Sequence, residues 1–197
     1  MTRDLIADRV VHAVGIGLGL VAAIVLVLVT VNDGGSGDLL PVLIYTTGLL
    51  AMLGCSAAYN VFHTSNRREW LRRFDHAAIF IMIAGTYTPF TTRLSEGWAL
   101  GLTAAIWAVA AMGIVLKLWQ PRRIETISIA LYLALGWIGL AAVAPFRAAL
   151  DARTLSLLAL GGIVYTAGVV FHLWRRLPYQ NAIWHGFVLV AASVHYV

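Results

Sequence analysis

Seven long apolar blocks, separated by short polar segments, constrain the fold of this chain more than any other feature. Each block is long enough, at ~1.5 Å per helical residue, to cross a hydrocarbon core of ~30 Å once its ends are included. Lipid cannot satisfy backbone N–H and C=O groups, so such segments cross as helices. We therefore predict an all-α bundle of seven transmembrane helices, forming one integral membrane domain over residues 1–197. The expected spans are residues 12–31, 39–62, 75–92, 98–119, 124–144, 154–174 and 180–197.

The composition supports a membrane location and excludes other classes of protein. The sequence is 60% hydrophobic and 12% charged, whereas a soluble domain carries roughly 25% charged residues. The formal net charge is +5, but Lys and Arg form short clusters between the apolar blocks rather than the basic stripe of a nucleic-acid-binding protein. We therefore expect no nucleic-acid partner. The single cysteine, Cys55, excludes an internal disulfide.

The distribution of the 14 Lys and Arg residues predicts the orientation. Eleven lie in the N-terminal segment and in the second, fourth and sixth connections, and three lie on the opposite side. Because basic residues concentrate on the cytoplasmic side of a membrane, we expect the N-terminus in the cytoplasm and the C-terminus outside. The eleven are Arg3, Arg9, Arg67, Arg68, Arg72, Arg73, Lys117, Arg122, Arg123, Arg175 and Arg176, and the three are Arg93, Arg147 and Arg153.

Polar residues at the predicted inner ends of three helices form a candidate site. Ser56 and Asn60 are four residues apart, as are Asn181 and His185, so each pair shares one helix face. Asp75 opens the third predicted helix. Polar groups at membrane depth are costly, so several at one level suggest a shared pocket. Two alternatives remain: Asp75 caps its helix, and the other residues face water or headgroups or form hydrogen bonds between packed helices.

The first predicted helix begins at His12, which can reach the same pocket. It contains Gly15-Ile16-Gly17-Leu18-Gly19, which looks like part of a dinucleotide-binding fingerprint but follows no strand and lies inside an apolar helix. Gly15 and Gly19 instead predict a close crossing with a neighbouring helix.

Six segments of the sequence resemble the hemolysin III family, which belongs with the progestin and adiponectin receptors. Their spacing covers nearly the whole chain, and the resemblance implies the same seven-helix topology with a zinc site near the cytoplasmic face. The segments are SAAYN at 56–60, LRRFDH at 71–76, AGTYTPF at 84–90, GGIVYTAGVVF at 161–171, LPY at 177–179 and AIWH at 182–185.

The resemblance also implies roles for individual residues. In the family, a Ser-x-x-x-His motif on the second helix supplies one zinc ligand and a His-x-x-x-His motif on the seventh supplies two. These positions correspond here to Asn60, Asn181 and His185. The family's aspartate on the third helix corresponds to Asp75, the implied catalytic base, and Ser56 is the implied hydrogen-bonding contact. The receptor branch is associated with hydrolysis of lipid amides such as ceramide, so the implied reaction is zinc-dependent amide hydrolysis.

This sequence departs from the pattern at two of the three ligand positions. Asn60 and Asn181 replace histidines, and an amide oxygen is a poor zinc donor beside imidazole. We therefore expect a disrupted zinc site and impaired hydrolysis. Two accounts stay open: a divergent member that lost the metal, or deliberate replacement of both histidines. Asp8 and Val11 also stand where the family often has Asn and Thr before the first-helix histidine.

The sequence contains three other histidines that could be considered as ligands. His63 and His76 would need rearrangement to replace the missing imidazoles. His195 lies ~15 Å of helix beyond His185, so we expect it to pack or to form a hydrogen bond.

The leading hypothesis is a lipid-interacting membrane protein on a metal-dependent hydrolase scaffold, located in the bacterial inner (plasma) membrane. Its pocket faces the cytoplasm around Asp75 and His185. One alternative is a receptor or sensor that binds a ceramide-like or fatty-acid ligand without chemistry. The other is a pore-forming hemolysin-type protein, although the helices lack a continuous polar face.

Overall fold

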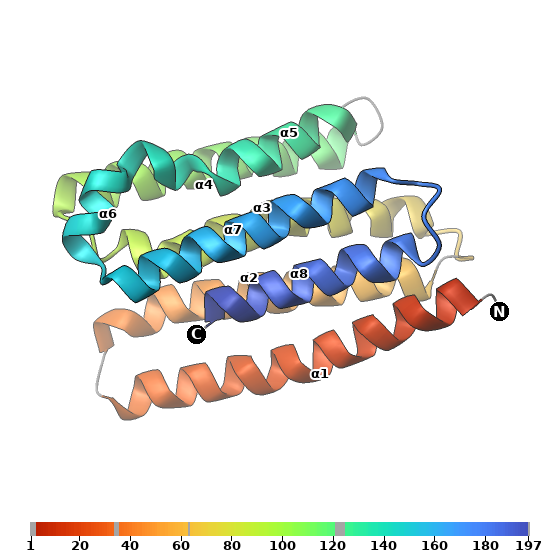
Figure 1. Ribbon diagram of the computed structural model, residues 1–197, viewed down its shortest axis with the longest axis horizontal. Helices are drawn as coiled ribbons and strands as arrows, with labels where there is room; N and C mark the ends of the chain where they lie inside the picture. Colours follow the sequence, from red (N-terminus) through yellow and green to blue (C-terminus); the bar gives the residue numbers. More distant parts are fainter. Residues whose placement is uncertain (1–2, 34–35, 63, 121–124, 197) are drawn as a thin grey trace.

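The computed structural model describes residues 3–33, 36–62, 64–120 and 125–196, and every regular element within these ranges is helical (Figure 1). The elements are α1 (Arg3–Asn32), α2 (Ser36–Val61), α3 (Arg68–Thr91), α4 (Glu96–Trp119), α5 (Glu125–Gly136), the 3-10 helix η1 (Ile138–Ala142), α6 (Val143–Ala149), α7 (Ala152–Leu173) and α8 (Gln180–Tyr196).

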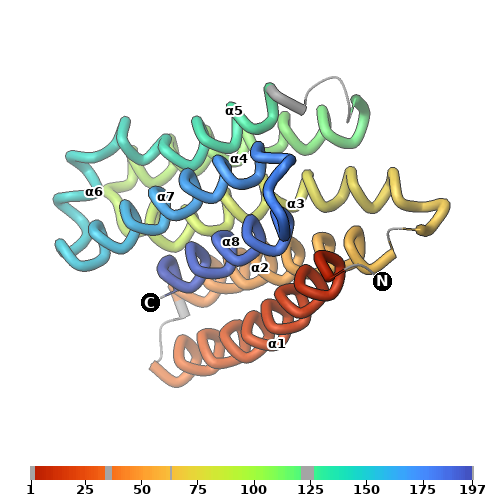
Figure 2. The backbone as a smooth tube through the Cα atoms, turned by 45° about the vertical axis from the view of Figure 1, so that its right-hand side comes forward, coloured from red at the N-terminus to blue at the C-terminus, as the bar shows by residue number. Residues whose placement is uncertain are grey.

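The helices follow one another around a ring in chain order, with η1 connecting α5 to α6. α1 packs on α2, α2 on α3, α3 on α4 and α4 on α5. α6 then packs on α7, α7 on α8, and α8 returns to α1. Figures 1 and 2 show the long helices running side by side in this arrangement. The ring brings the first and last helices of the chain together, which sequence order alone does not require.

Five segments are long and apolar enough to cross a membrane: Arg3–Asn32, Gly37–Val61, Glu96–Trp119, Ile127–Ala149 and Ala152–Leu173. α3 and α8 fall outside this set. α8 has only 17 residues, and α3 carries several charged residues in its first turns. The all-helical membrane architecture is therefore confirmed, whereas seven spans and the cytoplasmic N-terminus stay predictions.

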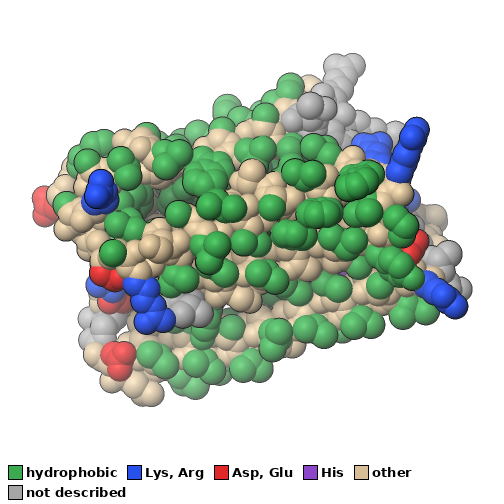
Figure 3. Space-filling model, viewed as in Figure 1, with side chains coloured by type: hydrophobic (Ala, Val, Ile, Leu, Met, Phe, Trp, Pro, Cys, Tyr) green, Lys and Arg blue, Asp and Glu red, His purple; other side chains and the backbone are tan. Residues whose placement is uncertain are grey.

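The surface agrees with a lipid environment. Hydrophobic side chains cover the length of the face in Figure 3, whereas acidic and basic side chains gather at its two ends. Large apolar residues stand outward on several helices, including Leu18, Leu100 and Met112. Because soluble proteins rarely expose such extensive apolar surface, the outer face of the ring is suited to lipid contact.

The predicted fifth span, 124–144, is wrong as a single continuous helix within its described part. The chain forms α5, η1 and α6 in succession, with Trp137 between α5 and η1. At this break the Tyr87 hydroxyl donates a hydrogen bond to Gly136 O and accepts one from Gly139 N. A membrane interior requires such partners because backbone groups there have no water.

Two predicted helix starts are also wrong. α1 begins at Arg3 rather than at residue 12, and α3 begins at Arg68 rather than at residue 75. Apolarity marks only the part of a helix that lies in lipid, and neither N-terminal extension contains Gly or Pro to end the helix. Asp75 therefore lies about two turns inside α3, so the interpretation of Asp75 as a helix cap is wrong.

The buried face of α1 is one stripe of five residues. Gly15 faces Leu189 of α8, where a Cβ atom would approach Leu189 Cδ2 to 2.8 Å, and Gly19 faces Leu53 of α2. Both glycines therefore pack against leucine side chains of neighbouring helices, and a close crossing of the helix backbones stays a prediction. The stripe consists of Asp8, His12, Gly15, Gly19 and Ala23.

Candidate metal centre

Three side chains from opposite ends of the sequence meet at one end of the ring. Asp8 and His12 come from α1, and His185 comes from the first turns of α8. Asp8 Oδ1 lies 2.7 Å from His185 Nδ1, and Asp8 Oδ2 lies 3.6 Å from His12 Nε2. One ligand atom from each residue lies within 4.8 Å of the others. This set, the proximal group, can therefore hold a metal ion.

The proximal group is buried, so its charged and polar atoms must compensate one another. Asp8 is only 4% exposed and His12 only 6%. A buried carboxylate is costly unless a charged or hydrogen-bonding partner compensates it. A carboxylate can only accept, so His185 Nδ1–H donates to Asp8 and Nε2 of a neutral His185 is an acceptor. The His12 and His185 rings, 4.3 Å apart between centroids, complete the cluster.

Ser56 of α2 extends the cluster on its other side. Its Oγ lies 3.5 Å from His185 Nε2, so the hydroxyl can donate to that nitrogen. Asn60, one turn further, donates its Nδ2–H to Ser56 O at 2.9 Å. Asp75 of α3 interacts electrostatically with the Ser56 hydroxyl and with both imidazoles of the proximal group. Asp8, His185 and Ser56 thus form a continuous polar chain beside the Asp75 carboxylate.

The remaining sequence-derived candidates lie outside the proximal group. Asn181 is exposed at the start of α8. His76 is partly buried on α3, where its carbonyl oxygen accepts a hydrogen bond from Tyr132. His63 lies outside the described residues. His195 Nε2 lies 3.2 Å from Leu158 O, which confirms its expected hydrogen-bonding role.

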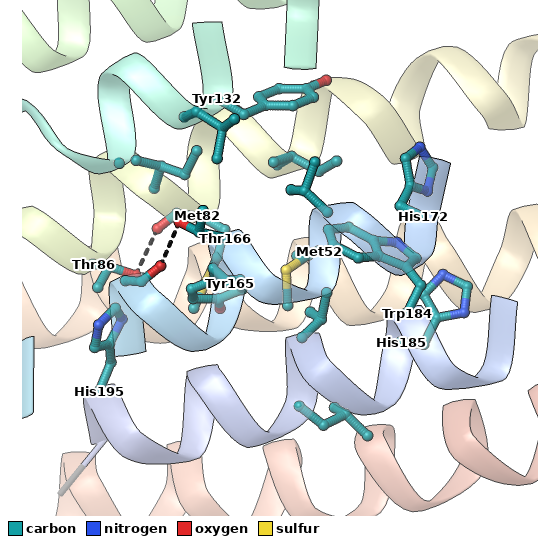
Figure 4. Close-up of a pocket in the computed structure, with 18 of the residues that line it drawn as sticks. Met52, Met82, Thr86, Tyr132, Tyr165, Thr166, His172, Trp184, His185 and His195 are labelled. Carbon is teal, nitrogen blue, oxygen red and sulfur yellow. Dashed lines mark hydrogen bonds between the residues drawn. The ribbon is translucent and has the colours of Figure 1, made fainter. Parts of the chain in front are cut away.

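All five residues predicted to form the site line one cavity of about 870 Å³ at the centre of the ring. Met52 and Met82 also line the cavity, and Figure 4 shows Met52 between its two ends. Figure 4 shows His172, Trp184 and His185 at one end and Tyr165, Thr166 and His195 at the other. The roles of the five residues in catalysis or metal binding stay predictions. They are Ser56, Asn60, Asp75, Asn181 and His185.

Sequence reasoning placed His12 near the pocket but assigned no ligand role to Asp8. The signal was nevertheless present. Gly15 and Gly19 were correctly assigned to a helix-packing face, and steps of three and four residues back along that face reach His12 and Asp8. Asp8 was missed because the apolar pattern placed the start of the helix after it.

Comparisons with known proteins agree on one family. A family model described as haemolysin-III related matches residues 6–196. The chain is 35% identical over 189 residues to the hemolysin-3 homolog of Bacillus subtilis, covering 95% of this chain and 88% of that protein. It is 33% identical over 195 residues to hemolysin-3 of Bacillus cereus, covering 98% and 88%. It is 30% identical over 162 residues to the human monocyte to macrophage differentiation factor, covering 78% and 66%.

Proposed function

We propose, given that the chain belongs to the haemolysin III family, that it is a multi-pass membrane hydrolase of lipid amides with a relocated metal centre. The observation that carries this proposal is the convergence of Asp8, His12 and His185, of which the two histidines line the cavity. The cavity faces the cytoplasm of a bacterial inner membrane in this account, and the substrate class is a ceramide-like amide.

The family's own ligand positions do not fit a zinc ion in this chain. Only His185 of the three is an imidazole, Asn60 donates its amide to its own helix, and Asn181 is exposed. The proximal group fits better. It offers two imidazoles and one carboxylate, a donor set found in catalytic zinc sites that keep a fourth position open. Binding of an ion by both Asp8 and His185 Nδ1 would replace the hydrogen bond between them and release the Nδ1 proton. His12 Nε2 is buried and has no hydrogen-bond partner among the described residues, so it is available to a metal.

The residues around the proximal group have separate roles in amide hydrolysis. A bound divalent ion such as zinc supplies Lewis acidity, which polarises a carbonyl group and acidifies water. Asp75 is the general base, because its carboxylate lies in the cavity beside Ser56 and both imidazoles. Ser56 positions the carbonyl oxygen through its hydroxyl. Met52 and Met82 hold the acyl chain and exclude water along its length.

A second candidate mechanism is favoured by the hydrogen-bond chain itself. Ser56 Oγ, His185 Nε2, His185 Nδ1 and Asp8 Oδ1 follow the order nucleophile, base and orienting acid that defines a serine hydrolase. In this mechanism Ser56 Oγ attacks the amide carbon, His185 takes the hydroxyl proton and passes it to the leaving amine, and water then releases the acyl group. No metal takes part.

Hydrolysis of a ceramide by the full chain in lipid nanodiscs tests the proposal. We expect fatty-acid release that a chelator abolishes and added zinc restores. His12→Asn should abolish it too, whereas His172→Asn, which replaces another imidazole lining the cavity, should not.

Three other results would each overturn this proposal. Chelator-resistant hydrolysis that Ser56→Ala abolishes would establish the serine mechanism instead. Ceramide binding without fatty-acid release would indicate a receptor. Ion flux across vesicles without either activity would indicate a pore.

A further inference from the structure

A second polar cluster lies at the other end of the cavity. His195 of α8 and Tyr165 of α7 line the cavity, with ring centroids 5.8 Å apart. We call Tyr165 and His195 the distal pocket. His195 lies ten residues, ~15 Å of helix, beyond His185.

Each residue of the distal pocket has a buried polar atom with no hydrogen-bond partner among the described residues: Tyr165 Oη and His195 Nδ1. The great majority of buried polar atoms in proteins are hydrogen-bonded, so each exception requires an explanation. In a membrane protein the cost is higher still, because no bulk water is available. Two such atoms beside one cavity indicate a group that the described part of the protein does not supply.

The hydrogen-bonding pattern identifies the chemistry of that group. Leu158 O can only accept, so His195 Nε2 carries the proton that it donates at 3.2 Å. In a neutral imidazole the other nitrogen, Nδ1, is then an acceptor that needs a donor. The phenol of Tyr165 can donate as well as accept. A hydroxyl fits this set because it donates one hydrogen bond and accepts two.

The position of His195 is built into the fold rather than incidental. Gly161 of α7 faces its imidazole, and a Cβ atom at residue 161 would overlap the ring. The neighbouring Gly162 faces Trp137 instead, at an ordinary contact distance of 3.4 Å. The absence of a side chain at Gly161 therefore leaves the space in which the His195 ring reaches both Leu158 O and the cavity.

We propose that the distal pocket binds a hydroxyl group carried on the chain of a single-chain lipid whose headgroup lies near His185. Apolar side chains that lie between the two ends, such as Met52, hold the methylene groups. Only the placement of the headgroup is shared with the proposed hydrolase activity. The preference for a hydroxylated chain requires neither a metal nor catalysis.

Binding of two matched fatty acids to the full chain in nanodiscs tests this inference. The probes are dodecanoic acid and ω-hydroxydodecanoic acid, which differ only in the terminal hydroxyl. We expect the hydroxylated acid to bind about threefold to tenfold more tightly, the effect of one net hydrogen bond. Tyr165→Phe should reduce this ratio to about one. Tyr132→Phe, which removes a cavity hydroxyl that already donates to His76 O, should leave the ratio unchanged.

The same comparison on chelator-treated protein separates this inference from the proposed function. A preference that persists there supports the distal pocket even if no hydrolysis is ever observed. Equal affinities for the two acids, no binding of either, or a ratio that survives Tyr165→Phe would each overturn the inference.

Discussion

The two ends of the cavity each contain a histidine, but the surroundings of the two histidines differ. At the proximal group, Asp8 pairs with His185 at 2.7 Å and lies 3.6 Å from His12, whose Nε2 has no hydrogen-bond partner among the described residues. At the distal pocket, Tyr165 Oη and His195 Nδ1 have none in the described part of the chain either. The proximal group therefore holds a charged pair together without a ligand, whereas both residues of the distal pocket need a partner from outside. On this basis we propose chemistry at the first and chain selection at the second.

The largest expected difference between the two ends is in the rate of hydrolysis. Asp75→Asn removes the proposed general base but keeps the shape of the side chain, so we expect ceramide hydrolysis to fall about 10²- to 10⁴-fold. Tyr165→Phe should change the rate for an unhydroxylated ceramide by less than about threefold, because it removes at most one distal hydrogen bond. Initial rates on the two variants check this. Similar losses in both would contradict the division between the two ends.

The space that Gly161 leaves for the His195 ring can be tested by replacing two adjacent glycines, Gly161 and Gly162. Gly161→Ala places a methyl group on the His195 ring and should destabilise the protein by about 1–3 kcal/mol through overpacking, while removing the preference for the hydroxylated acid. Gly162→Ala meets Trp137 only at ordinary contact distance and should be neutral or slightly stabilising. Thermal unfolding in nanodiscs gives both values. Equal effects at the two positions would show that the space at residue 161 contributes neither to stability nor to the preference for the hydroxylated acid.

The proximal group offers a similar pair on α1. Gly15→Ala places a methyl group 2.8 Å from Leu189 Cδ2 and pushes α1 away from α8. Because the Leu189 side chain can shift slightly, we expect the free energy of unfolding to fall by only about 1 kcal/mol. We also expect weaker metal binding. Gly17, with nothing within 4 Å of its added Cβ, is the control. Unchanged metal affinity in Gly15→Ala would argue against a site that spans α1 and α8.

The smallest expected effect concerns Asp151, a carboxylate that serves neither end. Its hydrogen bonds from Thr154, and then from Arg153 N, lower its pKa below the ordinary 3.8. Asp151 is the N-cap residue of α7. Because its pKa is lowered in the folded state, it stabilises α7 above pH 3.8, and this stabilisation is lost as the pH falls through the folded-state pKa. Asp151→Ala should therefore lower the unfolding temperature slightly at neutral pH and not in strong acid. An equal shift at both pH values would contradict the capping role.

The sequence predicted most of the architecture because lipid imposes a simple rule on composition. Apolar length located the helices, and the motif around Asp75 indicated the family. The helix starts were wrong because polar residues continue a helix past the lipid boundary, as α1 and α3 both do. The break at Trp137 was missed because the Tyr87 contacts that stabilise it come from a distant part of the chain.

The candidate site was predictable in part for the same reason. Ser56, Asp75 and His185 were placed at one depth, and they line one cavity. The metal-binding potential of Asp8 depends on α8 closing the ring against α1, a contact between the two ends of the chain that no local pattern contains. The distal pocket could not be predicted from the sequence for a different reason, because an atom without a hydrogen-bond partner can be recognised only when its surroundings are known.

Metal analysis of the purified protein, with Asn60 and Asn181 as they stand, tests the central claim most directly. The relocated centre predicts near-stoichiometric zinc that is lost in Asp8→Asn and His12→Asn and retained in His172→Asn. A metal-free protein that acquires zinc only after Asn60→His and Asn181→His would contradict it, because the ion would then depend on the family's positions rather than on Asp8 and His12.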